Sequence, residues 1–316
     1  MIFGRSLLVL NPWRAHSLAM FSRRSMLAAT SFVAASGVGL NALARSEPRA
    51  PPALEPPAMD DDPALVAAIN SPLRSPRNVA RDGWRHPLQS LDFWGLAPGL
   101  TVIDIDPGGG YWTEILAPYL AQGGGAYIAG IADPADANLS DEDRGARERF
   151  AAKYGAQNVY GPIAYVDFTF SGGLIAPPAS ADMILISREV HNLIPIPGAL
   201  DKTMADFYAV LRPGGVLAIE DHRADPRAMI ADASDGYVSE DFVIAAATKA
   251  GFAFQAKSEI NANPKDSKDH PFGVWTLPPS RRSAPDGQPP NPAFDHSRYD
   301  AIGESDRMTL RLGKAG

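Results

Sequence analysis

The sequence contains no cysteine in 316 residues, which excludes disulfide bonds, zinc sites built on thiolates and thiol nucleophiles. Basic residues are also scarce, since 29 Lys and Arg face 36 Asp and Glu and give a formal net charge of -7. Nucleic-acid binding therefore has no electrostatic support, because no excess of positive charge is available to neutralise phosphates. With 45% hydrophobic and 21% charged residues, the composition is otherwise ordinary for a globular protein.

Three common site motifs are missing as well. No G-K-[ST] follows a glycine-rich stretch, so the chain has no P-loop. A dinucleotide fingerprint starting at Gly108 would need glycine at position 113, where the chain has Thr113. Ser187 lacks the flanking glycines of the nucleophile elbow found in serine hydrolases.

Residues 1–44 have the order of an export signal. The pair Arg23-Arg24 precedes an uncharged run, residues 25–44, which ends in the small residues that a signal peptidase reads. "SRRSML" resembles a twin-arginine signal, and an ordinary secretory signal is the alternative. The run is too weakly hydrophobic for a stable membrane anchor, and Met20 offers a second start. We expect a periplasmic protein delivered by the twin-arginine export machinery, which N-terminal sequencing of the exported protein would test.

Residues 45–62 are rich in proline and acidic residues and are predicted to form a flexible leader. Residues 63–316 then have the pattern of one α/β domain. Apolar stretches typical of strands in a parallel sheet alternate with helical stretches, which predicts three layers around one sheet. Residues 278–297 are predicted to form a proline-rich surface loop. The predicted strands are 100–105, 123–133, 158–168, 181–187, 216–221, 252–260 and 307–312.

The stretch "VIDIDPGGGYWTEIL" (102–116) joins the first predicted strand to a helix through consecutive glycines. Gly108, Gly109 and Gly110 allow a ligand to approach the backbone closely, and free N–H groups at the helix N-terminus favour binding there. Because a pyrophosphate motif is missing, an adenosyl ligand fits this bend better than a dinucleotide. The alternative is a tight turn that selects glycine without binding a ligand.

This stretch resembles the first motif of class I S-adenosylmethionine-dependent methyltransferases. Residues 81–314 further resemble a family of predicted bacterial methyltransferases of unknown substrate, through "RDGWRHP", "PGGGYWTEILAPYL", "REVHNL", "LRPGGVLAIEDHRA", "AGFAF", "NPKDS" and "IGESDRMTLRL". The resemblance implies a Rossmann-like fold whose seven-stranded, mostly parallel sheet has its last strand antiparallel. It also implies S-adenosylmethionine as cofactor and methyl transfer to a small-molecule acceptor that the sequence does not identify.

The resemblance assigns residues of the glycine bend to the cofactor. Asp104 matches the acid that ends the first strand and helps to hold the methionine part, while Gly108 and Gly110 match the later glycines of the motif. Asp106 departs from the pattern, because the superfamily usually has its first glycine there. A carboxylate beside the cofactor's own carboxylate is unfavourable unless it turns away or meets a positive group.

Two further acids are candidates for the nucleoside part of the cofactor. Asp133, at the end of the second predicted strand, is the candidate for the ribose, although Ile131 fits that position equally well. Asp167, in the third predicted strand, is the candidate for the adenine end. Both acids could instead serve as turn or cap residues.

Ionisable residues gather after the fourth and fifth predicted strands, in "SREVHN" and "EDHRA". Because ligands of open α/β sheets bind beyond the carboxyl ends of the strands, these residues are expected at one rim of one cleft. Methyl transfer needs alignment of the reactants, and a base when the acceptor carries a proton. We assign that base first to His191 and second to His222, with Asp221 as orienting partner. Either histidine could instead be a helix cap or a hydrogen-bonded surface residue.

Two other functions are compatible with this sequence. Export would place the protein where S-adenosylmethionine is not expected to be plentiful. The chain could therefore be an exported, non-catalytic module that binds another small ligand, with Asp106 marking the lost activity. His191, Asp221 and His222 could also hold a metal ion by ligand type, but no metal-binding spacing supports this and no metal is predicted.

Overall fold

The computed structural model describes residues 62–132, 139, 144–169, 173–225 and 229–316. The predicted signal, almost all of the predicted leader and the candidate ribose ligand Asp133 lie outside this part of the chain. Within it, none of the helices has the length and apolar character needed to cross a lipid bilayer.

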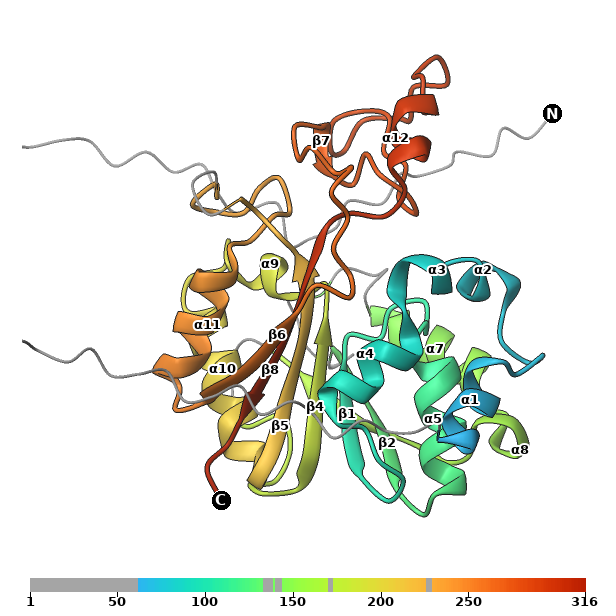
Figure 1. Ribbon diagram of the computed structural model, residues 1–316, viewed down its shortest axis with the longest axis vertical. Helices are drawn as coiled ribbons and strands as arrows, with labels where there is room; N and C mark the ends of the chain where they lie inside the picture. The colour runs from blue at the N-terminus through green and yellow to red at the C-terminus, as the bar shows by residue number, and fades with distance from the viewer. Residues whose placement is uncertain (1–61, 133–138, 140–143, 170–172, 226–228) are drawn as a thin grey trace, which may run out of the picture.

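Seven strands form one sheet in the order β3-β2-β1-β4-β5-β8-β6 (Figure 1). Strands β1 to β5 run parallel, and β8 runs antiparallel to both of its neighbours, β5 and β6. This is the predicted Rossmann-like fold of class I methyltransferases, with its antiparallel last strand. The strands are β1 (Thr101–Ile105), β2 (Ala126–Ala132), β3 (Ile163–Phe168), β4 (Ala181–Ser187), β5 (Leu211–His222), β6 (Ala253–Ser258) and β8 (Arg307–Gly313), while β7 (Pro271–Val274) stands apart from the sheet.

Side chains that alternate along the central strands build one apolar core on each face of the sheet. Ile103 and Ile184 belong to the core under α10 (Ala199–Val210) and α11 (Glu240–Lys249). Their neighbours Val102 and Met183 belong to the opposite core. Figure 1 shows the two groups of helices on either side of the sheet. The helices of the second group are α1 (Pro63–Ile69), α4 (Pro87–Trp94), α5 (Thr113–Gln122) and α7 (Ala146–Tyr154).

Capping side chains, a proline and a glycine mark where several of these helices begin and end. The Asp62 side chain accepts hydrogen bonds from the first free N–H groups of α1, and Pro63 fits the first turn because it lacks an N–H. The Ser239 side chain caps α11, and Gly95 ends α4 in the left-handed conformation. The short helices are α2 (Pro76–Val79), α3 (Asp82–Arg85), α8 (Gln157–Tyr160), α9 (Val190–Leu193) and α12 (Ser297–Ile302).

Two predicted strands differ most from the structure in where they begin. Residues 158–160, predicted as the start of the third strand, belong to α8 instead, because Gly161 (φ 71) turns the chain before β3 begins. Strand β5 begins at Leu211, five residues before its predicted start. The register with β4 shifts there, and this bulge accommodates Pro213 in the strand. Residues 278–296 contain neither helix nor strand, as predicted for a loop. They belong to a segment between β6 and β8 that contains β7 and α12 and stands beyond the carboxyl end of β5 (Figure 1).

Candidate active site

The bend after β1 is packed at one glycine and open at another. Gly110 has a left-handed backbone (φ 80), and a Cβ atom there would lie 1.9 Å from Tyr154 Oη, so this glycine permits packing against α7. A Cβ atom on Gly109 would meet no atom of the described residues within 4 Å. Trp112 does not fill the bend, because it is buried and its Nε1 donates to the serine that ends β4, at 3.1 Å. The bend therefore leaves room for a ligand beside Gly109.

Hydrogen bonds from α7 hold this bend in place. Tyr154 Oη and Lys153 Nζ both donate to the Gly109 carbonyl, at 2.7 and 2.9 Å. Glu114, in the first turn of α5, accepts from the Ser75 N–H at 2.9 Å and lies 3.5 Å from Lys153 Nζ. The backbone of the bend is thus ordered before a ligand arrives, which lowers the conformational cost of binding.

Asp104, the predicted cofactor-binding acid in β1, is buried with 1% of its surface exposed. Tyr127 Oη donates to its carboxylate at 2.7 Å, and Thr113 Oγ1 lies 2.7 Å from the same hydroxyl. Burial raises the pKa of Asp104 to about 7 against the effect of the Tyr127 hydrogen bond, and the charge of Asp106 adds to the rise. A positively charged ligand group would stabilise the ionised form of this carboxyl group.

The stability of the protein should depend on pH through Asp104. An acid whose pKa is raised by folding binds its proton more tightly in the folded state. Its contribution to the free energy of unfolding is therefore fully present below the unfolded pKa of about 4 and is lost as pH rises towards 7. Asparagine does not titrate, so Asp104→Asn removes this loss. When the pH is raised from 4.5 to 8, the free energy of unfolding of the variant should therefore increase by about 1–4 kcal/mol relative to that of the wild type. Urea unfolding of both proteins at pH 4.5 and pH 8 measures this change. If the wild type and the variant differ by the same free energy at both pH values, the prediction is wrong.

Two other acids that the sequence singles out lie in more exposed settings. Asp106 is exposed with φ 45, and its N–H donates to a carbonyl of β2 at 2.8 Å. Asp167, the candidate for the adenine end, sits opposite Ile131 of β2 and forms an ion pair with Arg147 at 2.7 Å, with 56% of its side chain exposed. Asp167 thus lies beside the strand that carries the candidate ribose position, while Asp133 itself lies outside the described residues.

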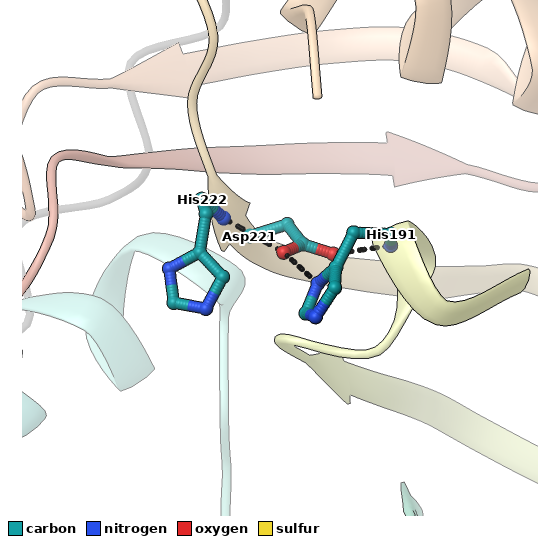
Figure 2. Close-up of side chains that lie close together, drawn as sticks. All are labelled: His191, Asp221 and His222. Atoms are coloured by element: carbon teal, nitrogen blue, oxygen red, sulfur yellow. Dashed lines mark hydrogen bonds and ion pairs between the residues drawn. The ribbon is translucent and has the colours of Figure 1, made fainter. Parts of the chain in front are cut away.

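The three residues predicted to carry the chemistry come together at the carboxyl ends of β4 and β5 (Figure 2). Asp221 and His222 end β5, and His191 lies in α9, directly after β4. His191 Nδ1 lies 2.8 Å from Asp221 Oδ1, and the His191 backbone N–H donates to Asp221 Oδ2 at 3.1 Å. All three residues are buried, and the two imidazole ring centres are 5.1 Å apart.

These hydrogen bonds determine which nitrogen of His191 is free to react. Because a carboxylate only accepts, the contact with Asp221 places the proton of neutral His191 on Nδ1 and leaves a lone pair on Nε2. Burial lowers the pKa of His222 well below its usual value, and the charges of His191 and Arg188 lower it further. His222 Nδ1 lies 2.6 Å from Ser305 Oγ. The arrangement is that of a base with its orienting carboxylate, which can remove a proton from an acceptor.

The same three side chains are close enough to share a cation, since one ligand atom of each lies within 4.8 Å of the others. However, Asp221 Oδ1 already accepts from His191 Nδ1 and from the His222 N–H, and Oδ2 accepts from the His191 N–H. A metal ion would have to compete with these bonds for the carboxylate. The hydrogen-bonded couple therefore describes this set better than a metal centre does.

A cavity of about 160 Å³ lies against the couple. His191, His222 and Arg188 contribute to its wall from the ends of β4 and β5, and Trp275 and Glu304 contribute from the segment between β6 and β8. Roughly five water molecules occupy this volume in liquid water. The cavity thus suits a small acceptor, or the reactive end of a larger one, next to the predicted base.

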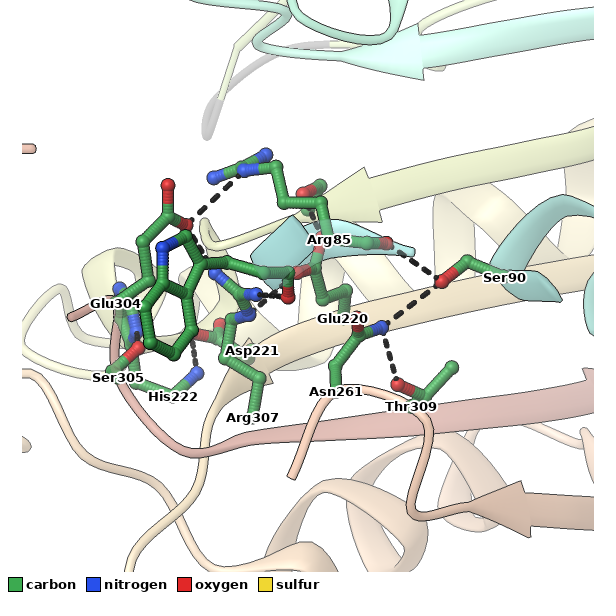
Figure 3. A network of polar contacts seen from close by, with 12 residues as sticks. Arg85, Ser90, Glu220, Asp221, His222, Asn261, Glu304, Ser305, Arg307 and Thr309 are labelled. Carbon is green, nitrogen blue, oxygen red and sulfur yellow. Dashed lines mark hydrogen bonds and ion pairs between the residues drawn. The ribbon is translucent and has the colours of Figure 1, made fainter. Parts of the chain in front are cut away.

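A buried ion cluster beside this cavity was not predicted from the sequence (Figure 3). Glu304 accepts from Arg81 Nε at 2.5 Å, from Arg85 Nε at 3.2 Å and from Arg307 Nη1 at 2.5 Å. Arg307 Nε also lies 2.8 Å from Glu220 Oε1. The one available signal was "ESDR", a charged run placed directly before an apolar strand, but its partners lie far away in the sequence.

Neither a protein-family model nor a curated protein matches the chain. Many solved structures are similar to it in fold, among them S-adenosylmethionine-dependent methyltransferases. One from Aquifex aeolicus is 20% identical and covers 64% of this chain and 94% of its own, with a TM-score of 0.44. One from Mesorhizobium loti is 14% identical and covers 74% and 99%, with a TM-score of 0.45. Because identities are this low and both scores are below 0.5, these similarities do not identify the reaction.

Proposed function

We propose that this protein transfers a methyl group from S-adenosylmethionine to a small-molecule acceptor. The observation that carries the proposal is the bend after β1, where the open side of Gly109 offers room for a ligand on a backbone that α7 already holds. The buried carboxyl group of Asp104 favours a positively charged neighbour, and the cofactor's amino group is one. These residues fit the cofactor, and the exposed Asp106 is the one that must turn away from the cofactor's carboxylate.

When bound, the cofactor supplies a methyl group on a sulfonium, which leaves as a thioether once the acceptor takes the methyl group. The residues of the chain then have two tasks, which are to align the acceptor and to take up the proton that the acceptor loses. We assign proton removal to His191 Nε2, which the hydrogen bond from Nδ1 to Asp221 leaves free. Asp221 stabilises the imidazolium that forms.

A second function is favoured by Asp106, which has a left-handed backbone where the methyltransferase motif usually has glycine. A non-catalytic, exported module that binds another small ligand would tolerate this carboxylate more readily than a transferase would. The predicted export signal favours the same alternative, because the cofactor is not expected to be plentiful outside the cytosol.

Titration of the full-length protein with S-adenosylhomocysteine separates these two functions, and two glycine variants sharpen the result. Gly109→Ala places a methyl group on the open side of the bend and should weaken binding about tenfold or more. The same change should alter the free energy of unfolding by less than about 0.5 kcal/mol. Calorimetric titration and urea unfolding measure the two effects.

Gly110→Ala is the matched control for this experiment. Its Cβ atom would collide with Tyr154, and its backbone (φ 80) disfavours alanine, so we expect a loss of about 2–4 kcal/mol of stability. Micromolar binding by the wild type that Gly109→Ala weakens favours the transferase. Absence of binding by the wild type favours the module, and an unaffected Gly109→Ala variant would remove the bend from the site.

A further inference from the structure

Guanidinium groups beside the cavity outnumber the carboxylates that they contact. The ion pairs described above use only Glu220 and Glu304. Arg188, which directly follows β4 and lines the cavity, takes part in no ion pair among the described residues. Its backbone N–H donates to the Glu220 carbonyl at 2.7 Å and anchors it there. We name four residues the arginine cluster: Arg81, Arg85, Arg188 and Arg307.

Several donors of the arginine cluster lack an acceptor among the described residues. Four of their nitrogen atoms are buried without a hydrogen-bond partner in the described part of the chain: Arg81 Nη2, Arg85 Nη1, Arg85 Nη2 and Arg188 Nε. Arg85 is fully buried, at 0% exposure, and burial together with the charge of Arg188 lowers its pKa to about 9. Buried charged donors that lack an acceptor are costly, so the cluster is short of one negatively charged partner.

The other acids near Arg188 do not provide that partner. Glu189 lines the same cavity and accepts from Asn192 Nδ2 at 2.8 Å. Burial and the charge of Asp106 raise the pKa of Glu189 well above its usual value, so this carboxyl group tends to keep its proton. Asp221 accepts its hydrogen bonds from the two histidines. The missing negative charge must therefore come from outside these residues.

We propose that the methyl acceptor carries a carboxylate or phosphate group, which binds to Arg188 close to the charges of Arg81 and Arg85. This inference rests on the proposed methyl transfer and names its substrate class. A guanidinium group matches both anions through paired N–H donors. The cavity wall joins Arg188 to His191, so an acid bound through its anion has the rest of the molecule beside the base. The glycine bend, residues 108–110, does not line this cavity, which assigns the anion to the acceptor rather than to the cofactor.

Thermal unfolding of the full-length protein in phosphate, acetate or chloride at constant ionic strength tests the anion site. Phosphate or acetate should raise the melting temperature of the wild type above its value in chloride. Arg188→Gln should increase the concentration needed for half of this effect about tenfold, because it removes charge-assisted donors. Arg188→Lys keeps the charge but loses the paired donors. Its half-effect concentration should therefore lie between those of the wild type and Arg188→Gln.

The matched control is Arg212→Gln at the opposite end of β5, where the Arg212 side chain is 43% exposed and pairs with Asp182 at 2.5 Å. It should respond to phosphate and acetate as the wild type does. Circular dichroism in chloride establishes that each variant is folded. If neither anion stabilises the wild type, or if Arg188→Gln responds as the wild type does, the proposal is wrong.

Two nucleosides then distinguish an acceptor anion from the cofactor's own carboxylate. Arg188→Gln should bind S-adenosylhomocysteine and 5′-methylthioadenosine, which lacks the amino acid part, as tightly as the wild type does. Loss of S-adenosylhomocysteine binding alone would place the guanidinium at the cofactor carboxylate and overturn the inference. A wild type that responds to phosphate through Arg188 but binds neither nucleoside would retain the anion site and remove the proposed methyl transfer.

Discussion

Replacing His191 with asparagine is expected to slow methyl transfer by about 10²–10⁴-fold, because the variant has no base at the position of Nε2. Asparagine keeps a side-chain N–H near the position of Nδ1, so the bond to Asp221 can persist and the fold is retained. Binding of S-adenosylhomocysteine should not change, because His191 lines the acceptor cavity and not the glycine bend. Single-turnover transfer of a labelled methyl group into a small-molecule extract measures the rate.

His222→Asn provides the comparison for this prediction. Its ring lies in the same cavity, but its Nδ1 contacts the Ser305 hydroxyl at 2.6 Å instead of a carboxylate. A hydroxyl orients the ring but does not stabilise a positive charge as a carboxylate does, so His222 should contribute less to proton removal and its loss should slow the reaction less. A larger loss for His222→Asn than for His191→Asn would exchange the two assignments.

Replacing Glu304 with glutamine is expected to destabilise the fold by about 3–5 kcal/mol, because it removes one partner from a buried ion cluster. Glu304 is 3% exposed and accepts from three guanidinium groups, those of Arg81, Arg85 and Arg307. Glutamine has nearly the same shape, so the loss reports the missing charge rather than a cavity. Unfolding in guanidinium chloride at pH 7 measures the difference.

Glu259→Gln is the matched control, since Glu259 pairs with Arg223 at 2.8 Å but has 63% of its side chain exposed. Water and salt screen such a pair, so the loss should stay below about 1 kcal/mol. An equal loss for both variants would show that the buried cluster has no special role in stability.

The Glu304 effect should also depend on pH. Burial alone would raise the pKa of Glu304, but the charges of Arg85, Arg307 and Arg81 outweigh it and hold that pKa well below its usual range. The stabilisation is therefore fully present above the unfolded pKa of about 4.3 and is lost as pH falls towards the folded pKa. The difference between wild type and Glu304→Gln should shrink below pH 4.

The central strands could be predicted because burial on both faces requires an uninterrupted apolar run. Strand β4 has its predicted bounds, and β1 starts one residue later than predicted. Residues that follow such strands lie at the carboxyl edge of a parallel sheet, so the proximity of His191 to Asp221 also followed from the sequence pattern. The start of β5 did not, because its bulge depends on pairing with β4.

The sequence alone could not reveal the arginine cluster or the contribution of residues 278–280 to the cavity wall. Arg85 and Glu304 are separated by 219 positions, and no local periodicity relates them. Apolar periodicity and glycine placement, which act between near neighbours, determined the order of strands and helices and the bend after β1. Only tertiary structure decided how charges are paired and which donors remain without an acceptor, because electrostatic energies depend on distances in space and on burial from water.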